Sequence, residues 1–359
     1  MFPLLSLIIF LPLIGGIVTL LLPRERLGLI RWTALAFAWA DLLIVLGLML
    51  GYSQAVPNFA ATIVGASPTA TYFATVHEQL NWIVTQNFSL SYSLDVDGIS
   101  LLLAALTSLL TVVCIGASFR NDQQGIPHDK SGGYMAFMLL LESGMLGVFL
   151  ASNLFLFYIF WELMLIPAYF LVGSWGGERR IYAAIKFVLY TSVGSLLMLA
   201  GIIALGYYHQ QLTPGSGYTL DFATLLNGRL DPTIQMWLFL AFAAAFAVKV
   251  PLVPFHSWLP DAYSEAPAPV TAMLAGAMSK TGAYGFLRFC LPLFPNAAHT
   301  LAPLINTLAV IGILYCAWMA LVQNDIKRLL GYSSISHLGI VMLGMFAFNV
   351  QGIEGSVLQ

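Results

Sequence analysis

The feature that most constrains this chain is a succession of apolar segments, each long enough to cross a lipid bilayer. A membrane-spanning helix needs about 20 mostly apolar residues, and here 59% of the residues are hydrophobic while only 8% are charged. Such segments lie near 2–22, 31–51, 98–118, 134–151, 153–173, 183–207, 233–256, 268–291, 302–322 and 331–349. The sequence therefore predicts an all-α polytopic membrane protein with about ten transmembrane helices.

The basic residues between these segments predict the orientation of the chain. The first apolar segment has no basic residue before it, which is unlike a signal peptide. Counted from an external N-terminus, the connections on the cytoplasmic side hold most of the loop cations, namely Arg24, Arg26, Arg31, Arg120, Lys130, Arg179, Arg180, Lys327 and Arg328. The opposite connections hold Arg229 alone. Because cytoplasmic loops collect Lys and Arg, we expect the N-terminus on the non-cytoplasmic side.

Two longer polar segments, 52–96 and 208–232, are expected on the external side. The first ends in FSLSYSLDVDGIS, whose alternation favours a short strand or hairpin. Asp95 and Asp97 then precede a helix, where capping of its N-terminus is favoured over a catalytic role.

The sequence lacks the motifs of a chain that itself binds nucleotides or redox groups. It has no G-x-G-x-x-G after a strand, no phosphate loop and no cysteine cluster. Cys114, Cys290 and Cys316 lie within apolar segments, which is typical of small buried residues. No basic run indicates nucleic acid. We expect no cofactor and no metal on this chain, so that any redox or ATP-driven activity belongs to a partner.

Residues 246–288 combine apolar sequence with prolines and charges that a membrane interior disfavours. Lys249 stands alone among apolar residues, and Pro251 and Pro254 follow it closely. Prolines break a helix where the freed backbone groups can face protein or water. The carbonyls of Ala247 and Val250 are expected to lose their helical partners and, together with the helix dipole, to favour the lysine. We interpret the stretch as a broken helix that conducts protons.

Glu162 is the only charged residue of the segment near 153–173, and Pro167 should kink that helix. An acid at such a depth is costly, so a functional role is favoured over helix packing alone. A buried lysine is readily shifted toward neutrality because desolvation disfavours its charge. We predict that Glu162 and Lys249 pair across two helices and form a proton switch.

Lys280 lies in AMLAGAMSKTGAYGFLRF, where small neighbours leave room for water or close helix contact. It is the expected next station for the proton. Arg288 follows two turns later and cannot usefully deprotonate, so we expect an anchor or a partner for an acid.

Two histidines are candidates for relaying protons, since imidazole titrates near neutral pH. His337 lies in SSISHLGIVML and is favoured as a relay, whereas for His256, in the break, a relay and a simple hydrogen bond are equally favoured. Both stay candidates.

Four further charged residues remain to be interpreted. Glu142, in LLLESGMLG, is a secondary candidate that faces a neighbouring subunit or couples to the Glu162–Lys249 pair. Lys186 either snorkels or begins the proton path. Asp261 is expected to cap a new half-helix beginning near Trp258, and Asp41 is an intramembrane acid without an evident partner.

Several of these stretches carry a family resemblance. FAVKVP, FHSWLPDAYSEAPAPVTAML and AMSKTGAYGFLRF resemble the signature of the antiporter-like proton-translocating subunits of complex I and of multisubunit cation/proton antiporters. DVDGISLLL, LFLFYIFWELMLIPAYF, KFVLYTSVGSLLML and NDIKRLLGYSSISHLG look like a membrane subunit of the proton-pumping NADH:quinone oxidoreductase. The resemblance runs through essentially the whole chain.

The resemblance implies a fold of fourteen helices with two inverted five-helix repeats and a broken helix 7. It places Glu162, Lys249, Lys280 and His337 on a polar axis that conducts protons. It divides the chain into 1–133 with helices 1–3 and an external loop, 134–291 as the first repeat, and 302–359 as the start of the second. Family members run beyond residue 359, so we expect a C-terminally truncated chain.

The resemblance also implies partners. Flavin, iron–sulfur clusters, NADH and quinone would lie on other subunits, and the chain would contact neighbouring antiporter-like subunits and lipid in a bacterial-type inner membrane. A subunit of a multisubunit sodium/proton antiporter is the alternative, although sodium would prefer a cage of oxygen ligands. A non-conducting membrane scaffold is a second alternative.

Overall fold

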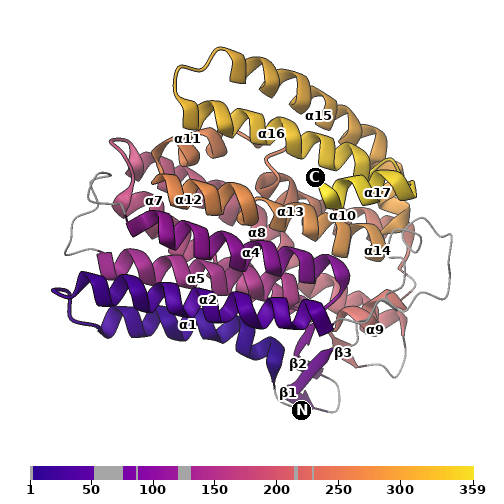
Figure 1. The fold of residues 1–359 in the computed structure, drawn as a ribbon. Helices are drawn as coiled ribbons and strands as arrows, with labels where there is room; N and C mark the ends of the chain where they lie inside the picture. The colour runs from indigo at the N-terminus through magenta and orange to yellow at the C-terminus, as the bar shows by residue number, and fades with distance from the viewer. Residues whose placement is uncertain (1–2, 52–75, 86–87, 120–130, 214–216, 229) are drawn as a thin grey trace.

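Most of the chain forms helices that run side by side (Figure 1). A computed structural model describes residues 3–51, 76–85, 88–119, 131–213, 217–228 and 230–359. The expectations for Arg120, Lys130 and Arg229, and for most of the 52–96 segment, lie outside the described residues.

Eight described helices are long and apolar enough to cross a membrane. They are α1 (Leu4–Leu21), α2 (Leu27–Gly51), α4 (Gly98–Ala117), α5 (Ser131–Leu150), α6 with α7 (Leu154–Leu163 and Leu165–Trp175), α8 (Arg180–Leu212), α10 (Pro232–Lys249) and α15 (Pro295–Leu321). Their outward faces are apolar; Leu189, Val193 and Leu196 of α8 are each at least 60% exposed. Such faces suit a lipid surrounding, which agrees with the predicted all-α membrane class.

The two remaining predicted spans are helical as well. The segment near 331–349 corresponds to α16 (Ile326–Met345), and α17 (Val350–Leu358) follows it. The segment near 268–291 alternates α-helix and π-helix: α12 (Ala268–Met273), η3 (Leu274–Met278), α13 (Lys280–Gly285), η4 (Phe286–Cys290) and α14 (Leu291–Leu293). The two π-helical turns were not predicted from the sequence.

Two prolines divide helices where the sequence places them. Pro167 has no N–H to donate to the carbonyl four residues earlier, that of Leu163, and the helix is interrupted at Met164 between α6 and α7. Pro251 has the same effect on α10, which ends at Lys249. The chain turns through residues 250–257 before α11 (Trp258–Glu265) begins. The expected span 233–256 is therefore shorter, and the broken helix is confirmed.

A small sheet lies at one end of the bundle, below α9 (Phe222–Leu226) in Figure 1. Strands β1 (His77–Thr85) and β2 (Phe88–Asp95) form an antiparallel hairpin, and β3 (Tyr218–Thr219) adds a short parallel edge. The carboxylate of Glu78 accepts hydrogen bonds from the N–H groups of Leu5 and Ser6 at 2.6 and 3.0 Å, at the start of α1. The hairpin predicted from FSLSYSLDVDGIS is confirmed.

The opposite end of the bundle, on the left of Figure 1, carries the connections α1–α2, α7–α8, α11–α12 and α15–α16. The described loop cations lie there: Arg24, Arg26, Arg179, Arg180, Lys327 and Arg328. We call this the basic end. The expected charge bias therefore holds among the described residues.

Candidate functional site

The interruption after α10 leaves Lys249 at the end of a half-helix. The carbonyls of Ala247 and Val250 do not accept from the Nζ of Lys249, contrary to the sequence-based expectation, because this nitrogen has no hydrogen-bond partner among the described residues. The N–H of Leu252 donates to the carbonyl of Ala247 at 2.9 Å, and the indole of Trp258 donates to that of Val248 at 2.9 Å. These two bonds satisfy the carbonyls of Ala247 and Val248 at the break, and the side chain of Lys249 extends elsewhere.

Lys249 is enclosed by aromatic rings. Its side chain is 1% exposed, and its Nζ has no hydrogen-bond partner among the residues that the structure describes. Nζ lies 5.2 Å from the ring centre of Trp161 and 5.6 Å from that of Phe187. An aromatic face attracts an ammonium group, but it gives none of the three hydrogen bonds that the group can donate. Carrying the proton at this position is therefore costly, which suits a group that must release it.

Glu162 lies beside this lysine without touching it. It is the next residue after Trp161, is half-buried near the end of α6, and its Oε1 is buried without a hydrogen-bond partner. No ion pair joins Glu162 to Lys249, although their charges interact. The structure therefore brings the two predicted partners together electrostatically but does not form the direct pair that we expected.

Lys280 follows the π-turn η3 directly. Its Nζ donates to the carbonyl of Ala275 at 2.8 Å, and the hydroxyl of Ser279 donates to the same oxygen at 2.8 Å. A π-turn widens the helix and is frequent at functional sites. This carbonyl is the only hydrogen-bond partner that the described residues give the ammonium group. The group therefore makes one of the three hydrogen bonds that it can donate.

Gly282 lets the helix of Lys280 approach the helix of Lys249. A Cβ at this glycine would lie 3.0 Å from the Cβ of Lys249 and 2.8 Å from Cγ2 of Val250. Only a residue without a side chain fits there. This close contact, which sequence reasoning did not single out, places α13 directly against the break.

Lys280 and His337 line one cavity of about 610 Å³ between the helix of Lys280 and α16. Ser333 and Ser334 also line it, at the positions the sequence placed near the histidine. The Nδ1 of His337 is 3.3 Å from Nε2 of Gln359. The cavity gives the lysine and the histidine a common space that is large enough for several water molecules.

His256 occupies the break itself. Its Nδ1 is buried without a hydrogen-bond partner, and its ring meets Tyr315 edge to face at 5.5 Å. The structure therefore does not bring His256 to the carboxylate of Glu162 or to either lysine by any described contact.

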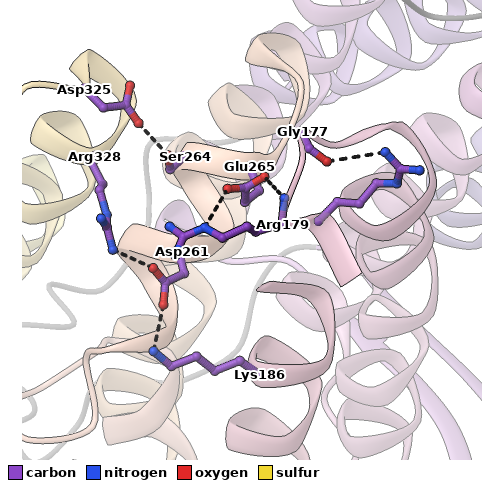
Figure 2. A network of polar contacts seen from close by, with 9 residues as sticks. Gly177, Arg179, Lys186, Asp261, Ser264, Glu265, Asp325 and Arg328 are labelled. Carbon is purple, nitrogen blue, oxygen red and sulfur yellow. Dashed lines mark hydrogen bonds and ion pairs between the residues drawn. The ribbon is translucent and has the colours of Figure 1, made fainter. Parts of the chain in front are cut away.

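An ionic network fixes the half-helix α11 at the basic end (Figure 2). Lys186 of α8 donates to Oδ2 of Asp261 at 2.7 Å and to the carbonyl of Ser257 at 2.8 Å. Arg328 of α16 donates to Oδ1 of Asp261 at 2.8 Å. Asp261 is thus an ionic link among three helices and not the cap that we expected, and Lys186 is an anchor of this link.

The network continues along the same surface. The carboxylate of Glu265 accepts from the backbone N–H of Arg179 at 2.9 Å (Figure 2). The hydroxyl of Ser264 donates to Asp325, and the Nζ of Lys327 donates to the carbonyl of Ala266 at 2.8 Å. These bonds hold α11 between α8 and α16, and so set one wall of the site.

Asp97 and Arg288 form a buried ion pair at the other end of the bundle, 2.6 Å between Oδ2 and NH1. Asp97 also caps α4 through the N–H of Ser100 at 2.7 Å. The cap by Asp97 and the anchoring role of Arg288 are confirmed, whereas Asp95 pairs with His77 and does not cap the helix. Glu142, the other secondary candidate, lies with Asp41 on a different side of α5 from the contacts with α6. Among the described residues, no group of three or more His, Cys, Asp or Glu could hold a metal ion.

Comparisons with known proteins agree with this architecture. Residues 151–359 match the family model described as NADH:quinone oxidoreductase/Mrp antiporter, transmembrane. The chain is 41% identical to NADH-quinone oxidoreductase subunit M of Pseudomonas aeruginosa over 98% of its own length and 67% of the relative's, and 40% identical to that of Escherichia coli with the same coverages. It thus spans about two thirds of the length of these relatives.

Solved structures share the fold. Respiratory complex I from Thermus thermophilus with bound NADH contains a chain that matches with a TM-score of 0.81 and 30% identity, covering 98% of this chain and 67% of that one. A chain of the archaeal membrane-bound sulfane sulfur reductase matches in fold, with a TM-score of 0.72 at 23% identity over 95% of this chain and 51% of that one. This chain therefore belongs to the family of antiporter-like membrane subunits of NADH:quinone oxidoreductase and Mrp antiporters, in which its relatives are M subunits of complex I.

Proposed function

We propose that this chain translocates protons across the membrane as an antiporter-like subunit of NADH:quinone oxidoreductase, and that Glu162, Lys249, Lys280 and His337 carry the protons. The observation that carries the assignment of residues is Lys249. It is a wholly buried lysine whose Nζ has no hydrogen-bond partner, at the interruption of a helix, with a carboxylate close by.

The proton path follows from the cost of the buried charge. The negative charge of Glu162 favours the protonated form of Lys249, while burial away from water and the missing hydrogen bonds disfavour it. A change that moves the Glu162 charge away releases the proton from Nζ. Lys280, on the helix that Gly282 brings against the break, accepts it through water. From Lys280 the shared cavity leads to His337. Glu142 and His256 are secondary candidates in this scheme.

The driving reaction lies outside this chain. The proposed complex oxidises NADH and reduces quinone on partner subunits, which would hold the flavin and the iron–sulfur clusters. In this proposal the role of this chain is different, because its buried titratable groups carry protons within apolar helices. The enzyme to which it contributes is a translocase assembled from several membrane subunits, including neighbouring antiporter-like ones.

The five-helix division 134–291, with 1–133 before it and 302–359 after it, is proposed as the functional organisation. The break after α10 and the π-turn before Lys280 both fall within 134–291. The proposed membrane is a bacterial-type inner membrane, with the basic end in the cytoplasm and the N-terminus outside.

Cysteine labelling tests this orientation. Cys114, Cys290 and Cys316 are buried, so a thiol introduced at an exposed site reports its own side. Arg179→Cys should react with an impermeant maleimide only in inside-out vesicles. Trp82→Cys, on the exposed hairpin, should react only in right-side-out vesicles. The reverse pattern would overturn the orientation.

Two other functions are distinguishable. A sodium/proton antiporter would exchange Na⁺ for protons without NADH, and a scaffold would assemble but conduct nothing. The purified complex should contain the NADH-oxidising subunits, and NADH should acidify inside-out vesicles without added Na⁺. Exchange that requires Na⁺ and persists without NADH would favour the antiporter instead.

The residue assignment is tested by Glu162→Gln in the assembled complex, with Glu354→Gln as the matched control on the exposed face of α17. Glu162→Gln keeps size and hydrogen bonding but removes the charge, so NADH-driven acidification should fall while the control is unchanged. Normal acidification by an assembled Glu162→Gln complex would contradict the assignment.

A further inference from the structure

Asp41 of α2 and Glu142 of α5 meet in the middle of the bundle, away from the proposed proton path. Both side chains have 0% exposure. Each lies near the middle of its helix, and α2, α4 and α5 pack against one another there. In the sequence the two acids are about 100 residues apart. In the fold they are neighbours because α2 packs on α5.

Their hydrogen bonds are incomplete. The hydroxyl of Ser108 on α4 donates to Oδ2 of Asp41 at 2.7 Å. Among the described residues, the other oxygen of Asp41 and both oxygens of Glu142 are buried with no donor at ordinary hydrogen-bond distance, although the hydroxyl of Thr111 on α4 interacts with Glu142. The two carboxyl groups are close enough to interact directly with each other. Three acceptor oxygens therefore remain to be satisfied within one small volume.

No cation of the surrounding helices compensates this pair. Helices α1 and α4 contain no charged residue, and α5 contains none besides Glu142. The nearest cation along α2, Arg31, lies ten residues from Asp41, or about 15 Å along a helix. Lys280 belongs to α13, which packs on α5, but its Nζ donates to the carbonyl of Ala275 and not to either acid.

The glycines of α5 show that α6 lies on another face of that helix. A Cβ at Gly144 would lie 2.8 Å from Cβ of Met164, and a Cβ at Gly147 would meet the ring of Phe160. Glu142 is two residues from Gly144, about 200° around the helix, so its side chain leaves from the face opposite α6. The pair is therefore separate from the site of Lys249.

Two ionised carboxylates in contact would repel each other in a medium that screens poorly. A single proton between them removes the repulsion and supplies a missing hydrogen bond. The resulting O–H···O⁻ bond satisfies one oxygen on each side and is among the strongest hydrogen bonds. We propose that Asp41 and Glu142 share one proton and form a second proton-holding site in the N-terminal half of the bundle. The Ser108 hydroxyl donates to Asp41, so Asp41 holds the negative charge and Glu142 carries the proton.

The site can take up one more proton, which would make it neutral, and release it again. Helix α5 packs against α6, which carries Glu162, and this helix links the pair to the proposed path. This consequence for transport rests on the proposed function, whereas the sharing of the proton does not.

Infrared difference spectroscopy of the assembled complex tests the sharing. A protonated carboxyl group has a carbonyl stretch that a carboxylate lacks. The spectrum of wild type minus Glu142→Gln should contain one such band. Asp41→Asn should shift that same band, because it replaces the charged acceptor, without revealing another. Glu354→Gln, an exposed acid on α17, should leave it in place.

Three outcomes would overturn the proposal: no carboxyl band at all, one independent band for each residue, or a band from Asp41 that Glu142→Gln leaves unshifted. Ser108→Ala covers the case in which a charge variant fails to assemble. It keeps both acids and removes only the hydroxyl donor, so the band should shift; an unshifted band contradicts the assigned geometry.

The proton-to-NADH ratio of the assembled Lys249→Met complex, read beside these spectra, separates this proposal from the proposed function. If Lys249→Met pumps normally, the function fails whatever the infrared spectra contain. If Lys249→Met abolishes pumping but the shared band is absent, only the carboxyl pair is wrong.

Discussion

The ammonium group of Lys249 lies over the ring of Trp161, 5.2 Å from its centre, and Trp161 is the residue before Glu162 in α6. The residue that contacts the buried cation is thus next in sequence to the acid whose charge acts on it. The cation and the acid interact electrostatically without a bond that would lock the proton in place. A salt bridge in the same position would hold the proton more firmly, because a hydrogen bond between charged groups is strong.

Gly282 should be intolerant of substitution. A valine there would push against Lys249 and Val250, since even its Cβ would lie 2.8–3.0 Å from their atoms. Overpacking of this kind costs about 1–3 kcal/mol. Gly282→Val should lower the melting temperature of the purified complex and reduce NADH-driven proton pumping. Gly116→Val in α4, where nothing lies within 4 Å of the added Cβ, is the control; equal losses in both would refute the packing argument.

Asp261 should couple α8 to α16. Its carboxylate is 10% exposed and accepts from both Lys186 and Arg328. Asp261→Asn removes the charge from two charge-assisted hydrogen bonds, each worth about 1.5–3 kcal/mol. The variant should have a lower melting temperature, and the backbone amide hydrogens of α11 should exchange with solvent faster.

The matched control for Asp261 is Glu354→Gln, an exposed acid that no described ion pair includes. A double-mutant cycle of Lys186→Met and Asp261→Asn should give non-additive losses. Additive losses would mean that the two residues are not coupled.

The hairpin should respond to pH through His77. Burial alone would lower the pKa of His77, but the hydrogen bond and the charge of Asp95 outweigh it and raise the pKa above its ordinary value of 6.5. A raised pKa means that the protonated form stabilises the folded state. This stability is fully present below about pH 6.5 and is lost as the pH rises through the folded pKa.

His77→Gln removes this dependence. The melting temperature of wild type should exceed that of the variant by the largest margin at low pH, and the margin should shrink as the pH rises. Thermal unfolding of the purified wild-type and variant complexes over a series of pH values measures this difference in melting temperature. A margin that grows with pH would contradict the assigned interaction.

Much of the helical framework follows from the sequence because a bilayer leaves few choices. Apolar runs of the right length form helices, Pro167 and Pro251 break them where a donor is missing, and Asp97 caps α4. These features depend on neighbours along the chain. The π-turns around Lys280 were missed because they have no comparable local signal.

The site was less predictable, because its contacts join distant helices. The candidates Glu162 and Lys249 stand out as charges in apolar runs, but the rings of Trp161 and Phe187 near Lys249 depend on how α6, α8 and α10 pack. Asp261 was misread for the same reason: its partners lie 75 and 67 residues away. The proximity of Asp41 to Glu142 could not be predicted from the sequence either, since the two acids lie on helices that are distant along the chain.

The most direct measurement of the central claim is proton pumping by the assembled complex carrying Lys249→Met, in inside-out vesicles supplied with NADH. Leu240→Met on the exposed face of the same helix is the control for a new methionine. We predict that proton flux through this chain falls about 100-fold or more, the scale of losing a positioned proton-transfer group, and that the control pumps normally. Unchanged proton-to-NADH stoichiometry in a fully assembled Lys249→Met complex would contradict the account.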